Sequence, residues 1–262
     1  MTSAPDAQPE SRLRHAEDVM GTVVSFDVPA LARDSGALAQ AIRRLHWADE
    51  TFSTYRPASD VSRLARAEIT LADCAPEVAE VLAACDALAG QTGGYFTAYP
   101  AGTLDPSGYV KGWAVEEAAR IIAAAGSAAH TVNGGGDIQC AGGRPDGTPA
   151  GARWRVGISS PFRAGTLALV VAGRDFAVAT SGTAERGAHI MDPVAGRPAT
   201  GLASVTIVGP ALTLADAYAT AAFAMGPARA REWTEDAIDG YEAYAIAPDG
   251  MTWQTSGFGQ YR

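Results

Sequence analysis

Apolar side chains follow a helical period in the first half of the chain and a strand-like alternation in much of the second half. Residues 19–28, VMGTVVSFDV, alternate well enough to predict a strand, after which Asp34 or Ser35 can cap a helix. The segment 76–94 opens with proline and ends on glycine, as helices prefer to do. In this half we expect helices over residues 38–50, 59–64, 76–94 and 111–126.

Short β-rich segments separated by glycine and proline turns replace the helices after residue 130. Strands are expected over residues 131–143, 153–159, 166–173, 175–182 and 204–209, helices over 212–226 and 227–236, and a hairpin that pairs 241–247 with 251–258. Because helices and strands do not alternate strictly, the order predicts an α+β fold with mixed or antiparallel sheets and packed helices. Residues 1–17 are polar and aperiodic, which predicts a disordered tail ahead of a domain at 18–262, either single or built of two closely packed lobes.

Composition narrows the classes of partner. The formal net charge of the 262 residues is −9, and no dense block of lysine and arginine is present, which argues against nucleic-acid binding. No apolar run approaches the ~18 residues that a membrane helix needs, and the N-terminus lacks the apolar core of a signal peptide. The three cysteines lack CxxC spacing and are expected to be reduced packing residues. We therefore expect a cytoplasmic protein with no membrane insertion.

The helix predicted at 212–226 carries Asp216 and Thr220 on one face of an otherwise apolar sequence. One interpretation is local: Thr213 and Asp216 have the spacing of a capping box, and Thr220 can bond back to the carbonyl four residues earlier. The other interpretation is a hard-cation site, in which these oxygens combine with backbone carbonyls and a ligand phosphate to hold Mg²⁺. Taken alone, the pattern favours the local interpretation.

A lone histidine, His189, lies next to Asp192 in the segment AHIMDPVAGRPATG. Loop histidines are more often structural or solvated than functional. Here Arg186 and Arg197 flank the histidine and form a local cationic cluster in an acidic protein. That combination makes His189 a candidate phosphate-binding group or general base.

Three further segments each have a plain and a functional interpretation. LDPSGYVKGW places Asp105, Gly108 and Lys111 at the start of a predicted helix, where a lysine is either solvated or paired with a bound anion. The glycines of NGGGDI, residues 133–138, allow either a turn with positive φ or close approach to a ligand, but they are not a GxGxxG fingerprint. Tyr55 either stacks on an aromatic ligand or fills the core, and the core is favoured.

Taken in order, these segments resemble one family, the bacterial FAD:protein FMN transferases, or ApbE-like flavin transferases. The resemblance extends from Met20 through the helix that contains Asp216. It rests on MGT at 20–22, FSTYRPASDVSRL at 52–64, GGYF at 93–96, LDPSGYVKGWAVEEAARII at 104–122, NGGGDI at 133–138, WRVGISSP at 154–161, TSG at 180–182, HIMDP at 189–193, GRP at 196–198 and ADAYATA at 215–221.

The resemblance implies an ApbE-like flavin transferase fold and a reaction. Members of the family cut the pyrophosphate of FAD and move FMN, through its phosphate, onto a Thr or Ser hydroxyl of an acceptor protein; AMP leaves and Mg²⁺ is required. Asp216, Thr220 and the backbone carbonyl of Gly108 match the metal site. His189 matches the histidine needed for transfer or for holding the flavin phosphates. The residues that fall where the family contacts FAD are Met20, Tyr55, Tyr95, Phe96, Thr97, Asp105, Lys111 and Met191.

The sequence departs from the family pattern at three positions. Thr97 stands where aspartate is usual, Ala219 where some members carry a further acidic residue, and Trp113 where tyrosine is common. The first two imply altered FAD or Mg²⁺ affinity. They keep two alternatives open beside the transferase: an FAD pyrophosphatase that releases FMN and AMP, and an FAD-binding protein without turnover.

Overall fold

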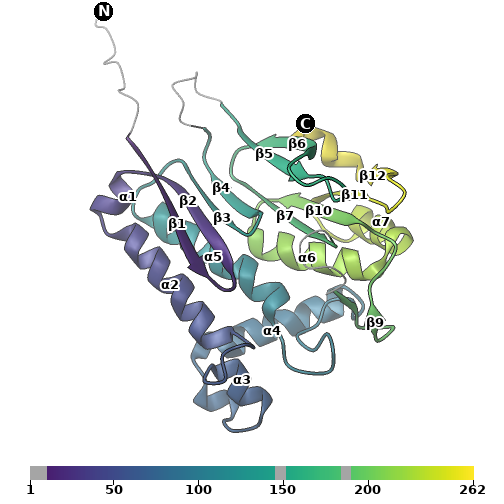
Figure 1. Ribbon diagram of the computed structural model, residues 1–262, viewed down its shortest axis with the longest axis horizontal. Coiled ribbons are helices and arrows are strands. Elements are labelled where there is room, and N and C mark those ends of the chain that lie inside the picture. The colour runs from purple at the N-terminus through teal and green to yellow at the C-terminus, as the bar shows by residue number, and fades with distance from the viewer. Residues whose placement is uncertain (1–10, 145–151, 184–189) are drawn as a thin grey trace, which may run out of the picture.

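The computed structural model describes residues 11–144, 152–183 and 190–262. Within these ranges eight strands form one antiparallel sheet in the order β1-β2-β3-β4-β7-β10-β11-β12 (Figure 1). The strands of this sheet are β1 (Arg12–Val19), β2 (Thr22–Pro29), β3 (His130–Gly134), β4 (Asp137–Ala141), β7 (Phe176–Gly182), β10 (Ser204–Gly209), β11 (Glu242–Ile246) and β12 (Thr252–Gln254). Two separate hairpins pair β5 (Trp154–Ser159) with β6 (Leu167–Gly173), and β8 (Met191–Asp192) with β9 (Arg197–Pro198).

The helices pack mainly on one side of this sheet, whereas β5–β6 and the C-terminal η2 lie on the other side (Figure 1). Helix α5 contacts both α2 and α6, and α7 packs on α6. The α+β prediction is confirmed. The helices are α1 (Leu31–Asp34), α2 (Ala37–Phe52), α3 (Asp60–Ala65), α4 (Pro76–Gln91), α5 (Ser107–Ala124), α6 (Leu212–Met225) and α7 (Pro227–Asp236), with 3₁₀ turns η1 (Leu71–Asp73) and η2 (Ser256–Tyr261).

Alternate residues of the central strands supply two separate hydrophobic cores. In β7, Ala177 and Ala179 face the helices, while Phe176 and Val178 belong to the cluster under β5–β6. Side chains on a strand point alternately to the two faces of the sheet, so a strand buried on both faces reads as a continuous apolar run. This is why the short apolar segments were correctly predicted as strands.

Two tight turns lie next to each other at one end of the sheet. Met20–Gly21 joins β1 to β2 with φ values of 55° and 68°, and Gly135–Gly136 joins β3 to β4 with φ values of 61° and 98°. Positive φ at both central residues is the requirement of the turn that matches strand twist, and it suits glycine far better than methionine. The backbone N–H of Gly135 donates to Val23 O at 3.2 Å, which holds the two turns together.

Several boundaries differ from those expected. Residues 12–17 of the predicted tail belong to β1, so that part of the prediction is wrong, whereas residues 1–10 lie outside the described residues. The expected strand at 19–28 is interrupted by the Met20–Gly21 turn. Helix α2 is preceded by Gly36 in the left-handed conformation, and neither Asp34 nor Ser35 caps it. The single domain at 18–262 stays a prediction.

Other expectations are confirmed. The Ser59 hydroxyl caps α3 by accepting from Ser62 N at 3.0 Å, and α4 opens with Pro76 at its first turn. Helix α7 spans the predicted residues. All three cysteines are free thiols, and Cys85 and Cys140 are buried.

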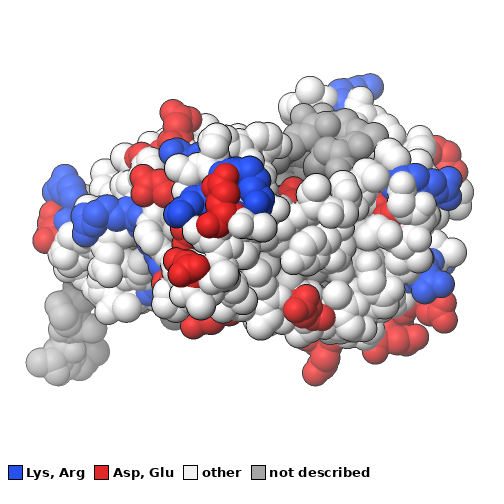
Figure 2. Space-filling model, turned by 90° about the horizontal axis from the view of Figure 1, so that it is seen from below, with Lys and Arg blue, Asp and Glu red and all other residues white. Residues whose placement is uncertain are grey.

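The described surface mixes both signs of charge. Figure 2 shows acidic and basic side chains interspersed on one face of the molecule. Among the described residues, no helix combines the length and the apolar character needed to cross a bilayer.

Candidate active site

Helices α5 and α6 approach closely where Gly112 faces Asp216. A Cβ atom at Gly112 would lie 2.8 Å from Asp216 Cβ and 2.9 Å from Leu212 O, so only glycine fits this contact. The backbone N–H of Gly112 donates to Asp216 Oδ2 at 2.9 Å. The glycine therefore turns the Asp216 carboxylate toward α5 and holds it there.

A buried cluster of three charges surrounds this contact. Lys111 Nζ lies 2.8 Å from Asp216 Oδ2 and also forms an ion pair with Asp137 Oδ2. The side chains of Asp137 and Asp216 are 8% and 7% exposed, and that of Lys111 is 26% exposed. Asp137 Oδ1 accepts from the backbone N–H of Thr180 at 2.8 Å. One ammonium group is thus shared by two carboxylates that come from different parts of the chain.

The cluster shifts the protonation of its members. Burial raises the pKa of Asp216 to about 6; the nearby charge of Asp137 acts in the same direction, and Lys111 opposes it. Burial alone would lower the pKa of Lys111, but the two carboxylates raise it above its ordinary value. Lys111 therefore stays charged, and the cluster has one negative charge more than positive when both carboxylates are ionised. Of the two interpretations of Lys111, the solvated one is wrong, and the anions that the structure places beside it are the carboxylates of Asp137 and Asp216.

The residues predicted to hold a metal lie together beside this cluster. Thr220 follows Asp216 by one helical turn and is half-buried. A Cβ atom at Gly108 would lie 3.6 Å from Thr220 Cγ2 and 3.8 Å from Thr220 Oγ1, so the first turn of α5 runs past Thr220. Just before that turn, Asp105 Oδ1 accepts from Ser107 N at 3.0 Å.

The capping-box interpretation of Asp216 is wrong. Helix α6 begins at Leu212 after Ala211, and no side chain of its own caps it. Glu116 on α5 accepts from both Thr213 N and Thr213 Oγ1, at 2.8 and 2.6 Å. Because the first turn of α6 is satisfied in this way, Asp216 is not needed as a cap.

The donor set suits a hard divalent cation. A carboxylate, a hydroxyl and a main-chain carbonyl are all oxygen donors, which Mg²⁺ prefers. Among the described residues, no group of three His, Cys, Asp or Glu side chains could hold a metal. A cation at Asp216 would therefore take its remaining oxygens from water and from a phosphate ligand.

Two of the segments predicted to contact FAD lie side by side, and one of them reaches Gly108. A Cβ atom at Gly94 would lie 3.7 Å from Val194 Cγ2 on the β8–β9 hairpin, which contains Met191. Phe96 is 2% exposed, and one of its ring carbons lies 3.4 Å from a Cβ built on Gly108. The segment at 94–96 thus contacts the β8–β9 hairpin at Gly94 and the first turn of α5 at Phe96.

The remaining predicted contacts are more dispersed. The Arg229 guanidinium lies 5.2 Å from the centre of the Tyr95 ring, and Thr97 Oγ1 accepts from Tyr99 N at 3.1 Å. Met20 occupies the strained turn beside the Gly135–Gly136 turn, and Asp137 follows Gly136 directly. Tyr55 is 95% exposed in the loop between α2 and α3, so its predicted place in the core is wrong.

The predicted catalytic residue His189 and its neighbour Arg186 lie outside the described residues. Of the other residues in that segment, Arg197 is exposed in β9. Asp192 Oδ1 accepts from the backbone N–H groups of Val194 and Ala195, which gives it a role in the hairpin turn.

The three departures from the family pattern differ in place. Trp113 points to α2, where its ring packs against Trp47 and Phe52, on a different face of α5 from Lys111. Ala219 is fully buried. Of the three, Thr97 is the one beside the segment that borders Gly108.

Sequence reasoning missed Asp137 and Thr180. Asp137 begins β4 immediately after the glycine turn, and NGGGDI was examined for its glycines alone. An acidic residue at the start of a buried strand was the available signal, because such a carboxylate needs a partner.

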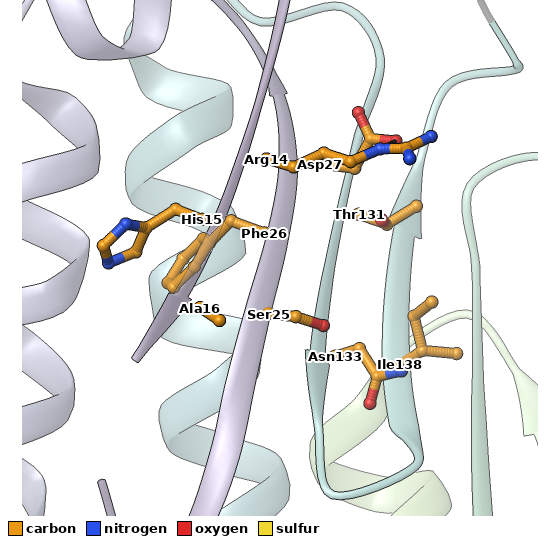
Figure 3. A pocket seen from close by; sticks show the side chains of 9 residues that line it. All are labelled: Arg14, His15, Ala16, Ser25, Phe26, Asp27, Thr131, Asn133 and Ile138. Carbon is orange, nitrogen blue, oxygen red and sulfur yellow. Dashed lines mark ion pairs between the residues drawn. The ribbon is translucent and has the colours of Figure 1, made fainter. Parts of the chain in front are cut away.

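An open pocket lies elsewhere on the sheet. It covers the outer face of β1 to β4 and is lined in part by Arg14, Asp27, Asn133 and Ile138 (Figure 3). None of the residues predicted for the site lines it. Asp27 is already paired with Arg12 and Arg14 there.

Solved flavin transferases share this fold. The flavin transferase ApbE from Vibrio cholerae superposes with a TM-score of 0.82 over 97% of this chain and 100% of its own, at 22% identity. The ApbE protein from Thermotoga maritima gives a TM-score of 0.83 over 96% and 99%, also at 22% identity. The fold is therefore that of the flavin transferases.

Sequence comparison then gives the family. The model of the ApbE family matches residues 20–101 and 97–245, and the chain belongs to this family. The FAD:protein FMN transferase of Escherichia coli K12 is 30% identical over 162 residues, which cover 58% of this chain and 44% of the relative. The Treponema pallidum enzyme of the same name is 36% identical over 160 residues, covering 56% and 44%. The aligned regions thus span less than half the length of these relatives.

Proposed function

We propose that this chain is a Mg²⁺-dependent FAD:protein FMN transferase that moves FMN from FAD to a Thr or Ser hydroxyl of an acceptor protein. The observation that carries the proposal is the meeting of Gly108, Asp216 and Thr220 beside the Lys111 ion-pair cluster, in a chain of the ApbE family. The names of the relatives support the reaction class.

In this proposal the Asp216 carboxylate, the Thr220 hydroxyl and the Gly108 carbonyl hold Mg²⁺. When bound, Mg²⁺ offsets the negative charge of the pyrophosphate. The Gly112 N–H fixes Asp216 Oδ2, so the carboxylate is oriented before any ligand arrives. Lys111 adds a fixed positive charge at the same place.

The transfer itself exchanges the phosphoanhydride bond of FAD for a phosphate ester. The acceptor oxygen forms a bond to the phosphorus of the FMN half, and the bond from that phosphorus to the bridging oxygen breaks. The bridging oxygen leaves with AMP, and the acceptor hydroxyl loses its proton. We propose His189 either as the group that takes the proton or as a phosphate-positioning group.

The remaining residues bind and place the flavin in this proposal. Met20, held in a strained turn, and the segment at 95–97 present fixed surfaces. A pre-organised site of this kind lowers the ordering cost of binding a large, flexible dinucleotide. The other proposed FAD contacts are Tyr55, Asp105, Lys111 and Met191.

A denaturing gel tests the proposal. The protein is incubated with FAD, Mg²⁺ and an acceptor domain known to receive FMN, with a known active transferase as positive control. Flavin fluorescence that migrates with the acceptor and disappears with a chelator is the expected result. A dark acceptor beside a fluorescent control contradicts transfer to that acceptor, and AMP formed without any acceptor identifies hydrolysis of FAD instead.

A further inference from the structure

Asp137 shares Lys111 with Asp216 and has no role in the function described so far. We propose that Asp137 is a positioning residue that holds the Lys111 ammonium aside, so that Asp216 can receive a divalent cation. The inference rests on the proposed function, because it concerns the same metal site. In this inference the last residue of the NGGGD segment, Asp137, influences metal binding through Lys111.

The contacts of Asp137 suit a fixed anchor. Its Oδ1 atom accepts from Thr180 N at 2.8 Å, and its Oδ2 atom pairs with Lys111. It follows the tight Gly135–Gly136 turn, is 5% exposed and lies on the sheet, whereas Asp216 lies on α6. Asp137 therefore keeps its place whatever happens at Asp216.

The contacts of Asp216 leave one oxygen available. Its Oδ2 atom accepts from Gly112 N and lies 2.8 Å from Lys111 Nζ. Among the described residues no hydrogen-bond donor contacts its Oδ1 atom. Cation binding at Asp216 thus depends on how strongly Lys111 neutralises this carboxylate.

The charges of the cluster explain why a second carboxylate is needed. With Asp137 absent, Asp216 would be the one carboxylate among the described residues that pairs with Lys111, and the ammonium group would neutralise it. A divalent cation would then meet a paired carboxylate and a repelling charge. With Asp137 present, Lys111 keeps a buried partner when a cation takes Asp216, which avoids an unpaired buried charge.

Four proteins and one probe test this. Free Mn²⁺ is measured by electron paramagnetic resonance while it is titrated alone, without flavin, into wild type, Asp137→Asn, Lys111→Met and the double variant. Asparagine keeps the size of the side chain and still accepts from Thr180 N through its oxygen. Competition with Mg²⁺ shows whether the two ions bind at the same place.

We expect Asp137→Asn to weaken Mn²⁺ binding at least tenfold and Lys111→Met to strengthen it. In the Lys111→Met background, Asp137→Asn should change the affinity less than threefold, because there is no ammonium group left to hold. Such non-additivity is the mark of a residue that acts through another. Lys111→Gln and Asp137→Ser replace any variant that fails to fold, as judged by circular dichroism.

A matched control separates this role from simple packing. Glu116→Gln removes another buried carboxylate between α5 and α6 and should leave Mn²⁺ affinity unchanged. Unchanged affinity in a folded Asp137→Asn variant overturns the inference. Equal weakening with and without Lys111 also overturns it, since Asp137 would then act only as a negative charge. A wild type that binds neither ion contradicts the metal part of the proposed function, and the inference falls with it.

Discussion

Helices α5 and α6 are joined by a buried carboxylate at two places: Glu116 of α5 contacts α6, and Asp216 of α6 contacts α5. At one place Glu116 accepts two hydrogen bonds from Thr213 and forms an ion pair with Arg120. At the other, Asp216 and Asp137 share Lys111, and burial raises the pKa of Asp216 to about 6.

The difference lies in how completely each charge is satisfied. Both carboxylate oxygens of Glu116 are occupied, Oε1 by Arg120, which also pairs with Glu117, and Oε2 by Thr213, so Glu116 closes the start of α6. The other contact has two carboxylates for one ammonium group, which leaves negative charge available to a cation. Similar packing thus supports one contact that closes the start of a helix and one that we propose as the cation site.

The largest expected effect follows from Asp216→Asn. The variant should lose at least about 100-fold in the rate of FMN transfer, because an amide is a poor ligand for a hard cation. The amide oxygen can still accept from Gly112 N, so the fold should persist. Gel-based transfer rates at limiting Mg²⁺, with thermal unfolding alongside, measure both. Transfer above a tenth of the wild-type rate would remove Asp216 from the metal site.

Gly112→Ala should be the most destabilising of the remaining changes. The added Cβ would lie 2.8 Å from Asp216 Cβ and would push α5 and α6 apart. Overpacking of this kind lowers the free energy of unfolding by about 1–3 kcal/mol. Urea denaturation provides the measurement.

Gly90→Ala serves as its control, since Gly90 lies inside α4 and a Cβ there meets nothing within 4 Å. Alanine should stabilise α4 by about 0.5–1 kcal/mol. Equal effects of the two substitutions would contradict the close contact at Gly112.

Glu116→Gln tests the structural half of the comparison. We expect a loss of about 1–2 kcal/mol in the free energy of unfolding, because the amide removes one of the two carboxylates paired with Arg120 and replaces a charged acceptor at Thr213. Transfer per folded molecule should be unchanged. A large loss of transfer at full stability would show that Glu116 belongs with the chemistry.

The smallest expected effect concerns pH and the far end of α5. His130 is fully buried, and its Nε2 lies 3.0 Å from Ala119 O, which can only accept, so this nitrogen carries the proton. Burial lowers the pKa of His130 below its ordinary value of 6.5. His130 therefore takes up a proton more readily in the unfolded chain than in the folded one. The free energy of unfolding should fall as the pH drops below 6.5.

Between pH 7 and 5.5 the contribution of His130 amounts to about 1 kcal/mol at most. The measurement is urea denaturation of wild type and His130→Gln at both pH values. The variant should lose less stability on acidification than wild type does. An equal loss in both would assign the pH dependence to other groups.

Local sequence patterns predicted many of the helices and strands. The helical period predicted α6 and α7, and the same period placed Asp216 and Thr220 on one face. The short, mainly apolar run SVTIVG predicted β10 with its observed bounds, because a strand buried on both faces lacks the alternation of apolar and charged positions. The opening of α5 was placed four residues too late, at Lys111 instead of Ser107.

Contacts between distant segments could not be predicted in this way. Asp137 meets Lys111 because β4 lies beside α5 in the fold, and nothing in the sequence of either segment indicates that the two pack together. The turn at Met20 was hidden because a methionine at positive φ continues the alternation of its neighbours. Strand β1 was missed because its sequence, RLRHAEDV, is mostly polar, as an edge strand allows.

Strand β1 limits how far the chain can be shortened at its beginning. It pairs with β2 from Arg12 to Val19, and the hairpin formed in this way ends at Met20. A protein beginning at residue 18 would leave β2 without its outer neighbour and would release the turn that carries Met20. The polar residues of β1 thus hold Met20, a proposed flavin contact, in its turn. N-terminal deletions should therefore stop before Arg12.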